Sequence, residues 1–307
     1  MRDIDVLPIP KYLKDKLKEV GISRIDQLVG MSKDTLIFLG FSENEALKAI
    51  RTSWSFYEPE VKNALEIEEE REFLETPLQR LNEILGGGFR VGTINEVFGP
   101  FASGKTSFLI TQAVISSQNG KVIFIDTEKT FDKSRAIEIA DNRGIDRENL
   151  KNILVIRAPS SNELILLITR LWQIVKDIKD SGERVNFIAI DSLTSPFRAD
   201  YVGLEHLVER QQKLNYCLRQ LMRMAEIYKL VVIFSNQVVA LPGEYAKWGP
   251  VGGHIVAHTS YCRIKFSKAP KKVRVGEIVD HPSVKEQTFK FIISEKGVED
   301  LKKVEEE

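Results

Sequence analysis

Residues 99–106 constrain the fold of this chain more than any other segment. They read Gly-Pro-Phe-Ala-Ser-Gly-Lys-Thr, with an apolar stretch at 94–98 directly before them and a helical pattern at 107–117 directly after them. Glycines at both ends allow backbone N–H groups to wrap around phosphate oxygens, and the N-terminal end of a helix adds a positive dipole. A strand, this loop and a helix in that order predict nucleotide binding in an α/β fold, with a bare structural turn as the alternative.

The predicted nucleotide site contains the whole loop and the first residue of its helix. Within it, Lys105 can reach the β- and γ-phosphate oxygens, and the Thr106 hydroxyl can bind Mg²⁺. The cofactors that this motif predicts are therefore ATP and Mg²⁺. The predicted binding residues are Gly99, Pro100, Phe101, Ala102, Ser103, Gly104, Lys105, Thr106 and Ser107.

From residue 76 onward, apolar strands alternate with amphipathic helices. Strands are expected at 122–126, 153–157, 187–191 and 230–235, with helices at 133–142, 162–178 and 204–228. Such alternation predicts a mostly parallel sheet with helices on both faces. Three further strands are expected at 260–266, 273–279 and 287–294 and predict an antiparallel extension of that sheet.

The N-terminal part has a different pattern, which predicts three regions in the chain. Short helices separated by glycines are expected at 12–20, 25–28, 35–39 and 43–50, so residues 1–53 form a small helical domain. Residues 54–75, with an acidic run, are expected to be a linker. Residues 76–307 are the α/β core.

The composition excludes several classes of protein. Lys and Arg total 44, as do Asp and Glu, so any binding of nucleic acid depends on local patches. The two cysteines and four scattered histidines lack the spacing of a zinc site or a disulfide framework. The N-terminus has no apolar signal segment, and no apolar run is long enough to cross a membrane. These features indicate a cytoplasmic protein without a membrane partner.

Three polar residues at strand ends are candidates for the chemistry. Asp191 ends an apolar strand, as a Walker B aspartate does, and is the predicted second ligand of Mg²⁺ beside Thr106. Glu128 follows another strand and could activate the attacking water. Gln237 follows a third strand and could sense the γ-phosphate. The alternatives are a carboxylate that caps the next helix and, for Gln237, simple polar termination of the strand.

Several motifs in the chain resemble those of the archaeal RadA branch of the RecA-type recombinases. They are Gly86-Gly87-Gly88-Phe89, the loop at 99–106, Asp126-Thr-Glu-Lys-Thr-Phe131, Asp191 to Tyr201, Glu209-Arg-Gln-Gln212, Ser235-Asn-Gln-Val238, Gly252-Gly-His254 and Glu295 to Asp300. The resemblance implies a RecA-type ATPase core and a helix-hairpin-helix N-terminal domain. It also implies ATP-dependent assembly on single-stranded DNA, with ATP between neighbouring protomers.

Matched position by position, the resemblance assigns further residues. Glu128 matches the catalytic glutamate, with Lys105 and Gln237 acting beside it at the γ-phosphate. Arg135 matches the arginine against adenine, His254 a contact to ATP from the adjacent protomer, and Asp280 with Pro282 the cap over the base. The loops after Asp191 and Gln237 match the two DNA-binding loops, and the predicted DNA contacts are Arg198, Tyr201, Tyr245, Lys247 and Trp248.

Departures from the family pattern favour a paralogue of the main recombinase. A short connection at 116–120 and Lys285 in place of a proline of the ATP cap are similar to paralogues of the RadB or RadC type. Val61-Lys62-Asn63-Ala64 replaces the Phe-x-x-Ala element of polymerisation, with Phe56 nearby as a possible substitute. Gly203-Leu204-Glu205 replaces a cationic Gly-Arg-Gly in the first DNA loop. The first hairpin of the N-terminal domain reads Leu7-Pro-Ile-Pro-Lys-Tyr12, and prolines have no N–H to offer phosphate. Residues 1–50 carry eight basic and eight acidic residues, so a protein-contact domain is as well supported as a DNA clamp.

The favoured hypothesis is a DNA-dependent ATPase of recombination and repair that assists or regulates the main RadA recombinase. It would act as a homo-oligomer or in a complex with that recombinase, and at the nucleoid if the source is archaeal. The strand-exchange recombinase itself is one alternative, and an ATP-switched, non-catalytic scaffold is another. A hexameric helicase is disfavoured by Phe197-Arg-Ala-Asp-Tyr201 and His254.

Overall fold

The computed structural model describes residues 2–58, 63, 65, 72–203, 205–240 and 248–301. Internal contacts divide the chain into two compact units. The first contains residues 1–70 and 168–177, and the second contains residues 71–167 and 178–307. Val61 and Ala64 of the predicted polymerisation element lie outside the described residues.

The N-terminal unit consists of short helices packed around their own core. These are η1 (Ile4–Val6), α1 (Lys11–Glu19), α2 (Ile25–Val29), α3 (Lys33–Phe38) and α4 (Glu43–Ser55). The unit buries Leu13, Leu17 and Leu36 completely, and the α4 N-terminus has a capping box between Ser42 and Glu45. Because α4 continues to Ser55, the expected end of that helix at residue 50 was wrong: the capping box and buried face sustain a longer helix.

Three of the four lysines clustered on α1 are already engaged within this unit. Lys14 donates to the Asp5 carbonyl oxygen at 2.6 Å, Lys16 pairs with Glu45 at 3.0 Å and Lys18 pairs with Asp5 at 2.6 Å. Such pairs reduce the positive potential available to a phosphate. Phe56, the suggested substitute in polymerisation, packs against the core of this unit.

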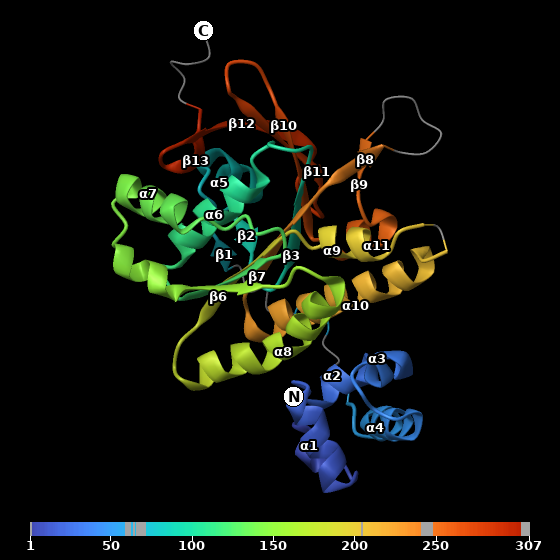
Figure 1. The fold of residues 1–307 in the computed structure, drawn as a ribbon. Helices are drawn as coiled ribbons and strands as arrows, with labels where there is room; N and C mark the ends of the chain where they lie inside the picture. The colour runs from blue at the N-terminus through green and yellow to red at the C-terminus, as the bar shows by residue number, and fades with distance from the viewer. Residues whose placement is uncertain are drawn as a thin grey trace. The chain divides into compact units, whose positions relative to one another are not determined.

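A nine-stranded sheet forms the centre of the second unit (Figure 1). Its strand order is β13-β12-β11-β10-β3-β7-β6-β4-β5, and the six strands from β10 to β5 are parallel. The bounds of the parallel strands are β3 (Ile94–Phe98), β4 (Lys121–Asp126), β5 (Ile153–Arg157), β6 (Val185–Asp191), β7 (Val231–Asn236) and β10 (Cys262–Lys268). A mostly parallel sheet was predicted, and the structure confirms it.

The C-terminal strands correct one expectation. β11 (Arg274–Asp280), β12 (Gln287–Ser294) and β13 (Gly297–Asp300) extend the sheet as antiparallel neighbours. The strand expected at 260–266, however, is β10, which runs parallel to β3. The chain reaches β10 through the helix α11 (Gly253–Thr259), and a helical connection allows the next strand to enter from the same end of the sheet as its neighbour.

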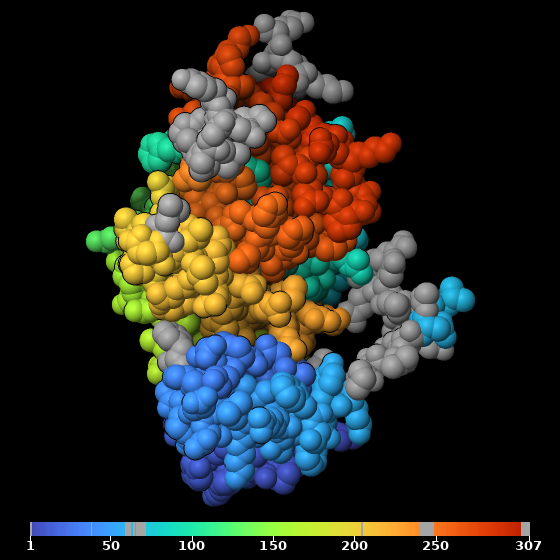
Figure 2. Space-filling model, turned by 90° about the vertical axis from the view of Figure 1, so that its right-hand side faces the viewer, coloured from blue at the N-terminus to red at the C-terminus, as the bar shows by residue number. Residues whose placement is uncertain are grey.

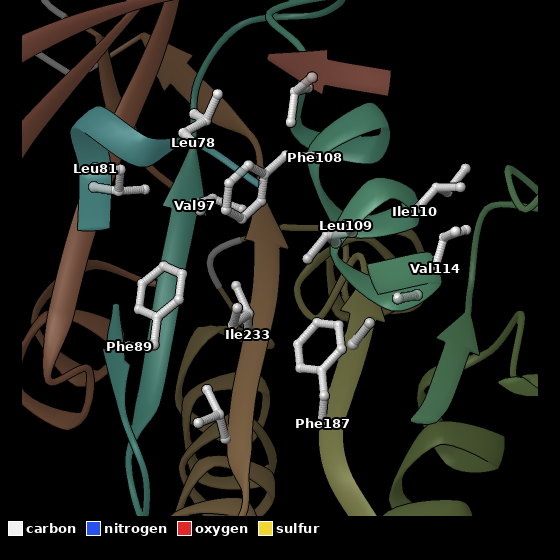
Figure 3. Close-up of a cluster of buried hydrophobic side chains, with 14 of the residues drawn as sticks. Leu78, Leu81, Phe89, Val97, Phe108, Leu109, Ile110, Val114, Phe187 and Ile233 are labelled. Carbon is white, nitrogen blue, oxygen red and sulfur yellow. The ribbon is translucent and has the colours of Figure 1, made fainter. Parts of the chain in front are cut away.

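Helices cover both faces of the sheet. α6 (Lys105–Ser116) packs on β4, β6 and β7 and against α7 (Lys133–Arg143), whereas α10 (Leu207–Tyr228) packs on β3 and β7 and against α11. α8 (Ser161–Asp180) belongs partly to each unit. Figure 3 shows the core under α6, where Phe108 and Leu109 face Val97 of β3 and Ile233 of β7. None of the described helices combines the length and apolar character needed to cross a membrane.

The remaining elements are short, and local patterns did not predict them. The predicted helix at 204–228 begins only at Leu207, and a separate short helix, α9 (Ser195–Asp200), precedes it. Most of the short elements lie in connections, where tertiary pairing outweighs local propensity. They are β1 (Phe73–Leu74), α5 (Gln79–Leu85), β2 (Phe89–Arg90), η2 (Arg147–Asn152), α9 (Ser195–Asp200), β8 (Val238–Ala240) and β9 (Trp248–Pro250).

Candidate nucleotide site

The glycine-rich loop connects β3 to α6 and needs its two glycines for steric reasons. Gly99 has φ +153°, and a Cβ atom there would lie 2.1 Å from the Phe266 carbonyl oxygen of β10. Gly104 has φ +106° and is the N-cap of α6. Side chains at these positions would force the loop away from β10 or strain its backbone. The loop therefore presents its backbone at the N-terminal end of α6, as an anion site requires.

Two side chains of the loop fit a phosphate chain. The Ser103 side chain is fully buried, and its hydroxyl has no hydrogen-bond partner among the described residues. The Lys105 ammonium donates to the carbonyl oxygens of Gly99 at 2.8 Å and Pro100 at 3.0 Å. Burial lowers the pKa of Lys105, and the charges of Asp191 and Glu128 oppose that shift. A phosphate group would give the Ser103 hydroxyl an acceptor, and it could replace the backbone carbonyl oxygens as acceptor for the Lys105 ammonium.

Asp191 is the most buried charged group of the site. It is 4% exposed and accepts hydrogen bonds from Thr106 at 2.7 Å, from Thr130 at 2.9 Å and from Ser235. Burial raises the pKa of Asp191; the three hydroxyl donors lower it, and the charge of Glu128 raises it further. A carboxylate and a threonine hydroxyl in contact form an oxygen donor set of the kind that Mg²⁺ prefers. Thr106 and Asp191 are thus placed as the predicted metal ligands should be.

Glu128 lies beside this pair, at the ends of neighbouring strands. Its carboxylate accepts hydrogen bonds from Ser192 at 2.8 Å and from the Gln237 amide at 3.1 Å. Ser192 is itself fixed, because its N–H donates to the Thr127 hydroxyl at 2.8 Å and its carbonyl oxygen accepts from that hydroxyl at 2.9 Å. The Glu128 carboxylate is therefore held by a fixed serine, and its side chain is exposed to solvent.

These groups line one cleft of about 660 Å³. All nine predicted residues of the loop line it, as do Glu128, Asp191 and Gln237. The other lining residues were not predicted as site residues, and they are Thr130, Ser192, Ser235, Val238, Arg274 and Ile293. Ser192 and Thr130 lie within two residues of predicted carboxylates, so a search around those positions could have found them. Arg274 lies on β11, outside every quoted motif, whereas Ile293 lies on β12, two residues before the motif at 295–300.

Four residues matched by resemblance lie outside this cleft. The Arg135 guanidinium bonds Glu138 and the Ser294 carbonyl oxygen. Ser294 directly follows Ile293, which lines the cleft. Asp280 and Pro282 are exposed at the end of β11. His254 is exposed on α11, where its ring stacks on that of His258 with 5.9 Å between centroids. The arrangement of a single chain does not bring His254, Asp280 or Pro282 into the cleft.

The predicted DNA contacts differ in their surroundings. Arg198 is exposed on α9. Tyr201 is half-buried, since the Lys213 ammonium lies 4.8 Å from its ring centroid and donates to its hydroxyl. Tyr245, Lys247 and the side chain of Trp248 lie outside the described residues. Figure 2 shows the surface of this region, with α10 in yellow beside the orange segment that includes α11.

The loop, the strand-end carboxylates and the sheet define a P-loop α/β protein. The family described as Rad51 matches residues 70–301. A DNA repair and recombination protein RadA from Metallosphaera sedula is 35% identical over 96% of this chain and 94% of its own length. The chain therefore belongs to the Rad51 family, and the resemblance predicted from its motifs is confirmed.

Proposed function

We propose that this protein is a DNA-dependent ATPase of homologous recombination and repair that assists or regulates a main RadA recombinase. The observation that carries the proposal is the cleft in which Lys105, Thr106, Asp191, Glu128 and Gln237 converge. The relative from Metallosphaera sedula, a DNA repair and recombination protein, supports the process. Single-stranded DNA is the proposed nucleic-acid partner.

The residues of the cleft divide the work of ATP hydrolysis. The loop backbone, Ser103 and Lys105 would bind the phosphates, and Thr106 with Asp191 would hold Mg²⁺, which when bound neutralises charge on the phosphate oxygens. Glu128 would orient and deprotonate the attacking water. Gln237 donates to Glu128, so the sensor and the base are in direct contact. Arg135 is proposed to lie against adenine, with Asp280 and Pro282 over the base, and His254 to contact ATP bound to an adjacent protomer.

Two observations support an assisting role over that of the main recombinase. The exposed Glu205 carboxylate lies over Gly203 in the first candidate DNA loop, so the space beside that glycine is negatively charged. In the N-terminal unit, Lys14, Lys16 and Lys18 have partners within the unit. Both features weaken the attraction for phosphates that filament formation on DNA would use.

Glu128→Gln tests the proposed catalytic base. Hydrolysis of ATP in the presence of single-stranded DNA should fall by about a hundredfold or more, because an amide cannot accept the proton. Binding of ATP should change little, since the amide keeps the hydrogen bond from Ser192. The measurement is steady-state phosphate release together with equilibrium ATP binding. Glu148→Gln, a surface carboxylate paired with Lys151, is the control, and equal loss in both variants would refute the assignment.

Arg198→Ala tests the first candidate DNA loop. We expect weaker binding of single-stranded DNA at every sequence and a salt dependence whose slope falls by about one unit, as for loss of one phosphate contact. Fluorescence anisotropy across a salt series measures both. Arg147→Ala removes an exposed arginine that pairs with Asp141 and should leave the slope unchanged. An unchanged slope in Arg198→Ala would remove this residue from the DNA surface.

One further experiment separates the assisting role from the alternatives. Strand exchange by the purified protein alone, with filaments on single-stranded DNA, would identify the main recombinase. Tight ATP binding without hydrolysis above background would identify an ATP-switched scaffold. Stimulation of a partner recombinase, with little strand exchange by this protein alone, is the expected result.

A further inference from the structure

A buried polar chain crosses the sheet next to the nucleotide cleft. Asn236, at the end of β7, is fully buried. Its side-chain oxygen accepts a hydrogen bond from the Thr194 hydroxyl at 2.5 Å. Its nitrogen donates to the Glu96 carboxylate at 2.7 Å and to the Val251 carbonyl oxygen at 2.7 Å. Both N–H groups of this amide are therefore in use, which fixes its orientation.

The chain is anchored by a buried ion pair. Glu96 of β3 is fully buried, and its second oxygen receives the Arg263 Nε of β10 at 2.7 Å. The Arg263 guanidinium also lies 5.5 Å from the centre of the Phe98 ring. Breaking a buried pair leaves an uncompensated charge, so Glu96 and Arg263 hold each other in place.

Asn236 contacts one end of each candidate DNA segment. Thr194 directly precedes α9, the helix that carries Arg198 and leads to Tyr201. Val251 closes the second segment, and its backbone N–H returns to the Gln237 carbonyl oxygen at 3.0 Å. One side chain thus joins Thr194 and Val251, which are 57 residues apart in the sequence.

The residues on either side of Asn236 contact the nucleotide cleft instead. Ser235 donates to Asp191, and Gln237 donates to Glu128 at 3.1 Å. Successive residues of an extended segment point to opposite faces of the sheet. Ser235 and Gln237 therefore face the cleft, while Asn236 faces the DNA segments. A shift of this strand end would move contacts in the cleft and contacts to both segments.

We propose that Asn236 is a positioning residue that couples both candidate DNA segments to the nucleotide cleft. A displacement of Gln237 by the γ-phosphate would move the end of β7, and through Asn236 it would move Thr194 and Val251 together. Glu96 and Arg263 supply the fixed point against which this movement is made. The inference rests on the proposed function, because it assumes that these segments contact DNA.

Asn236→Ala and Asn95→Ala form a matched pair of variants. Asn95 is also a fully buried asparagine, but it bonds Thr93 and the Val232 carbonyl oxygen instead of the DNA segments. The ratio of ATP hydrolysis with single-stranded DNA to hydrolysis without it should fall at least about fivefold in Asn236→Ala, which is the low end of typical coupling between sites. The ratio in Asn95→Ala should equal that of the parent protein.

A milder variant and a second measurement show whether an effect of Asn236→Ala comes from lost coupling or from lost folding. Thr194→Val removes one hydroxyl at nearly constant shape and should lower the same ratio, with an unchanged circular dichroism spectrum. In a Trp54→Phe, Trp172→Phe background, Trp248 is the remaining tryptophan. Its fluorescence should respond to ATP in the parent and Asn95→Ala proteins and respond less in Asn236→Ala.

The possible failures are distinguishable. If Asn236→Ala and Thr194→Val keep the parental ratio and fluorescence response, the coupling role of Asn236 is overturned while the proposed function stands. If the parent protein shows neither ATP hydrolysis nor a response to DNA, the proposed function is overturned, and the inference with it.

Discussion

Replacing Lys105 by alanine should reduce ATP hydrolysis by at least about a hundredfold, the typical effect of removing a group that stabilises charge in a transition state. In the structure, the Lys105 ammonium lies over the loop, bonded to the carbonyl oxygens of Gly99 and Pro100. We expect it to exchange these bonds for bonds to phosphate oxygens when nucleotide binds. Steady-state phosphate release with and without single-stranded DNA measures the effect.

The control for this variant is Lys151→Ala. Lys151 is exposed and pairs with Glu148 outside the cleft, so its loss should leave hydrolysis within about twofold of the parent, as for surface changes of small energy. Thermal unfolding of both variants shows whether the fold is intact. Parental hydrolysis in Lys105→Ala would mean that the loop is not the nucleotide site, and every role assigned from it would be wrong.

Replacing Asp191 by asparagine should have opposite effects on stability and activity. Without nucleotide and Mg²⁺ at neutral pH, the free energy of unfolding should rise, because a neutral amide of similar shape avoids the cost of burying a carboxylate charge. Mg²⁺-dependent hydrolysis should fall by about a hundredfold, since an amide binds the metal weakly. Urea unfolding and phosphate release measure the two effects.

The stability difference between Asp191→Asn and the parent should depend on pH in a definite direction. Burial raises the pKa of Asp191 in the folded state, so the folded protein retains a proton at pH values where the unfolded chain has lost it. The contribution of this group to stability is thus full below the unfolded pKa and is lost as pH rises through the folded pKa. The advantage of Asp191→Asn over the parent should therefore shrink as the pH is lowered.

Asp141→Asn is the control for Asp191→Asn. Asp141 is an exposed carboxylate that pairs with Arg147, and its replacement should leave the free energy of unfolding close to that of the parent, as is usual for surface pairs. If Asp191→Asn proved less stable than the parent at neutral pH, the hydroxyls of Thr106, Thr130 and Ser235 would outweigh the cost of burying the charge. The conclusion that folding raises the pKa of Asp191 would then be wrong.

The side of the cleft formed by the loop and the strand-end carboxylates was predictable because it is encoded locally. Gly99, Lys105 and Thr106 lie within eight consecutive residues, and Glu128 and Asp191 each follow an apolar strand of recognisable pattern. In a parallel sheet, the carboxyl ends of the strands meet at one edge. The register of the sheet places Asp126 opposite Asp191, so the carboxylates that follow β4 and end β6 meet beside the loop.

The opposite wall of the cleft was not predictable in this way. Arg274 and Ile293 reach it from β11 and β12, and the pairing of β10 with β3 that places those strands is parallel, against expectation. The pattern of a strand carries little information about the direction of its partners, because pairing depends on distant segments. The same limitation applies to β8 and β9, which are three residues each and lie at the ends of the second candidate DNA segment.

The sequence by itself determined the P-loop, the alternating α/β core and the identity of the strand-end carboxylates, since each depends on residues close together in the chain. Only the tertiary structure decided that Ser192 and Gln237 both bond Glu128 and that Asn236 joins Thr194, Glu96 and Val251. Those contacts link β3 and the ends of β4, β6 and β7 with two loops, and the bonds of Asn236 to Thr194 and Glu96 are buried. Their geometry is set by the packing of the sheet, which no local pattern of residues contains.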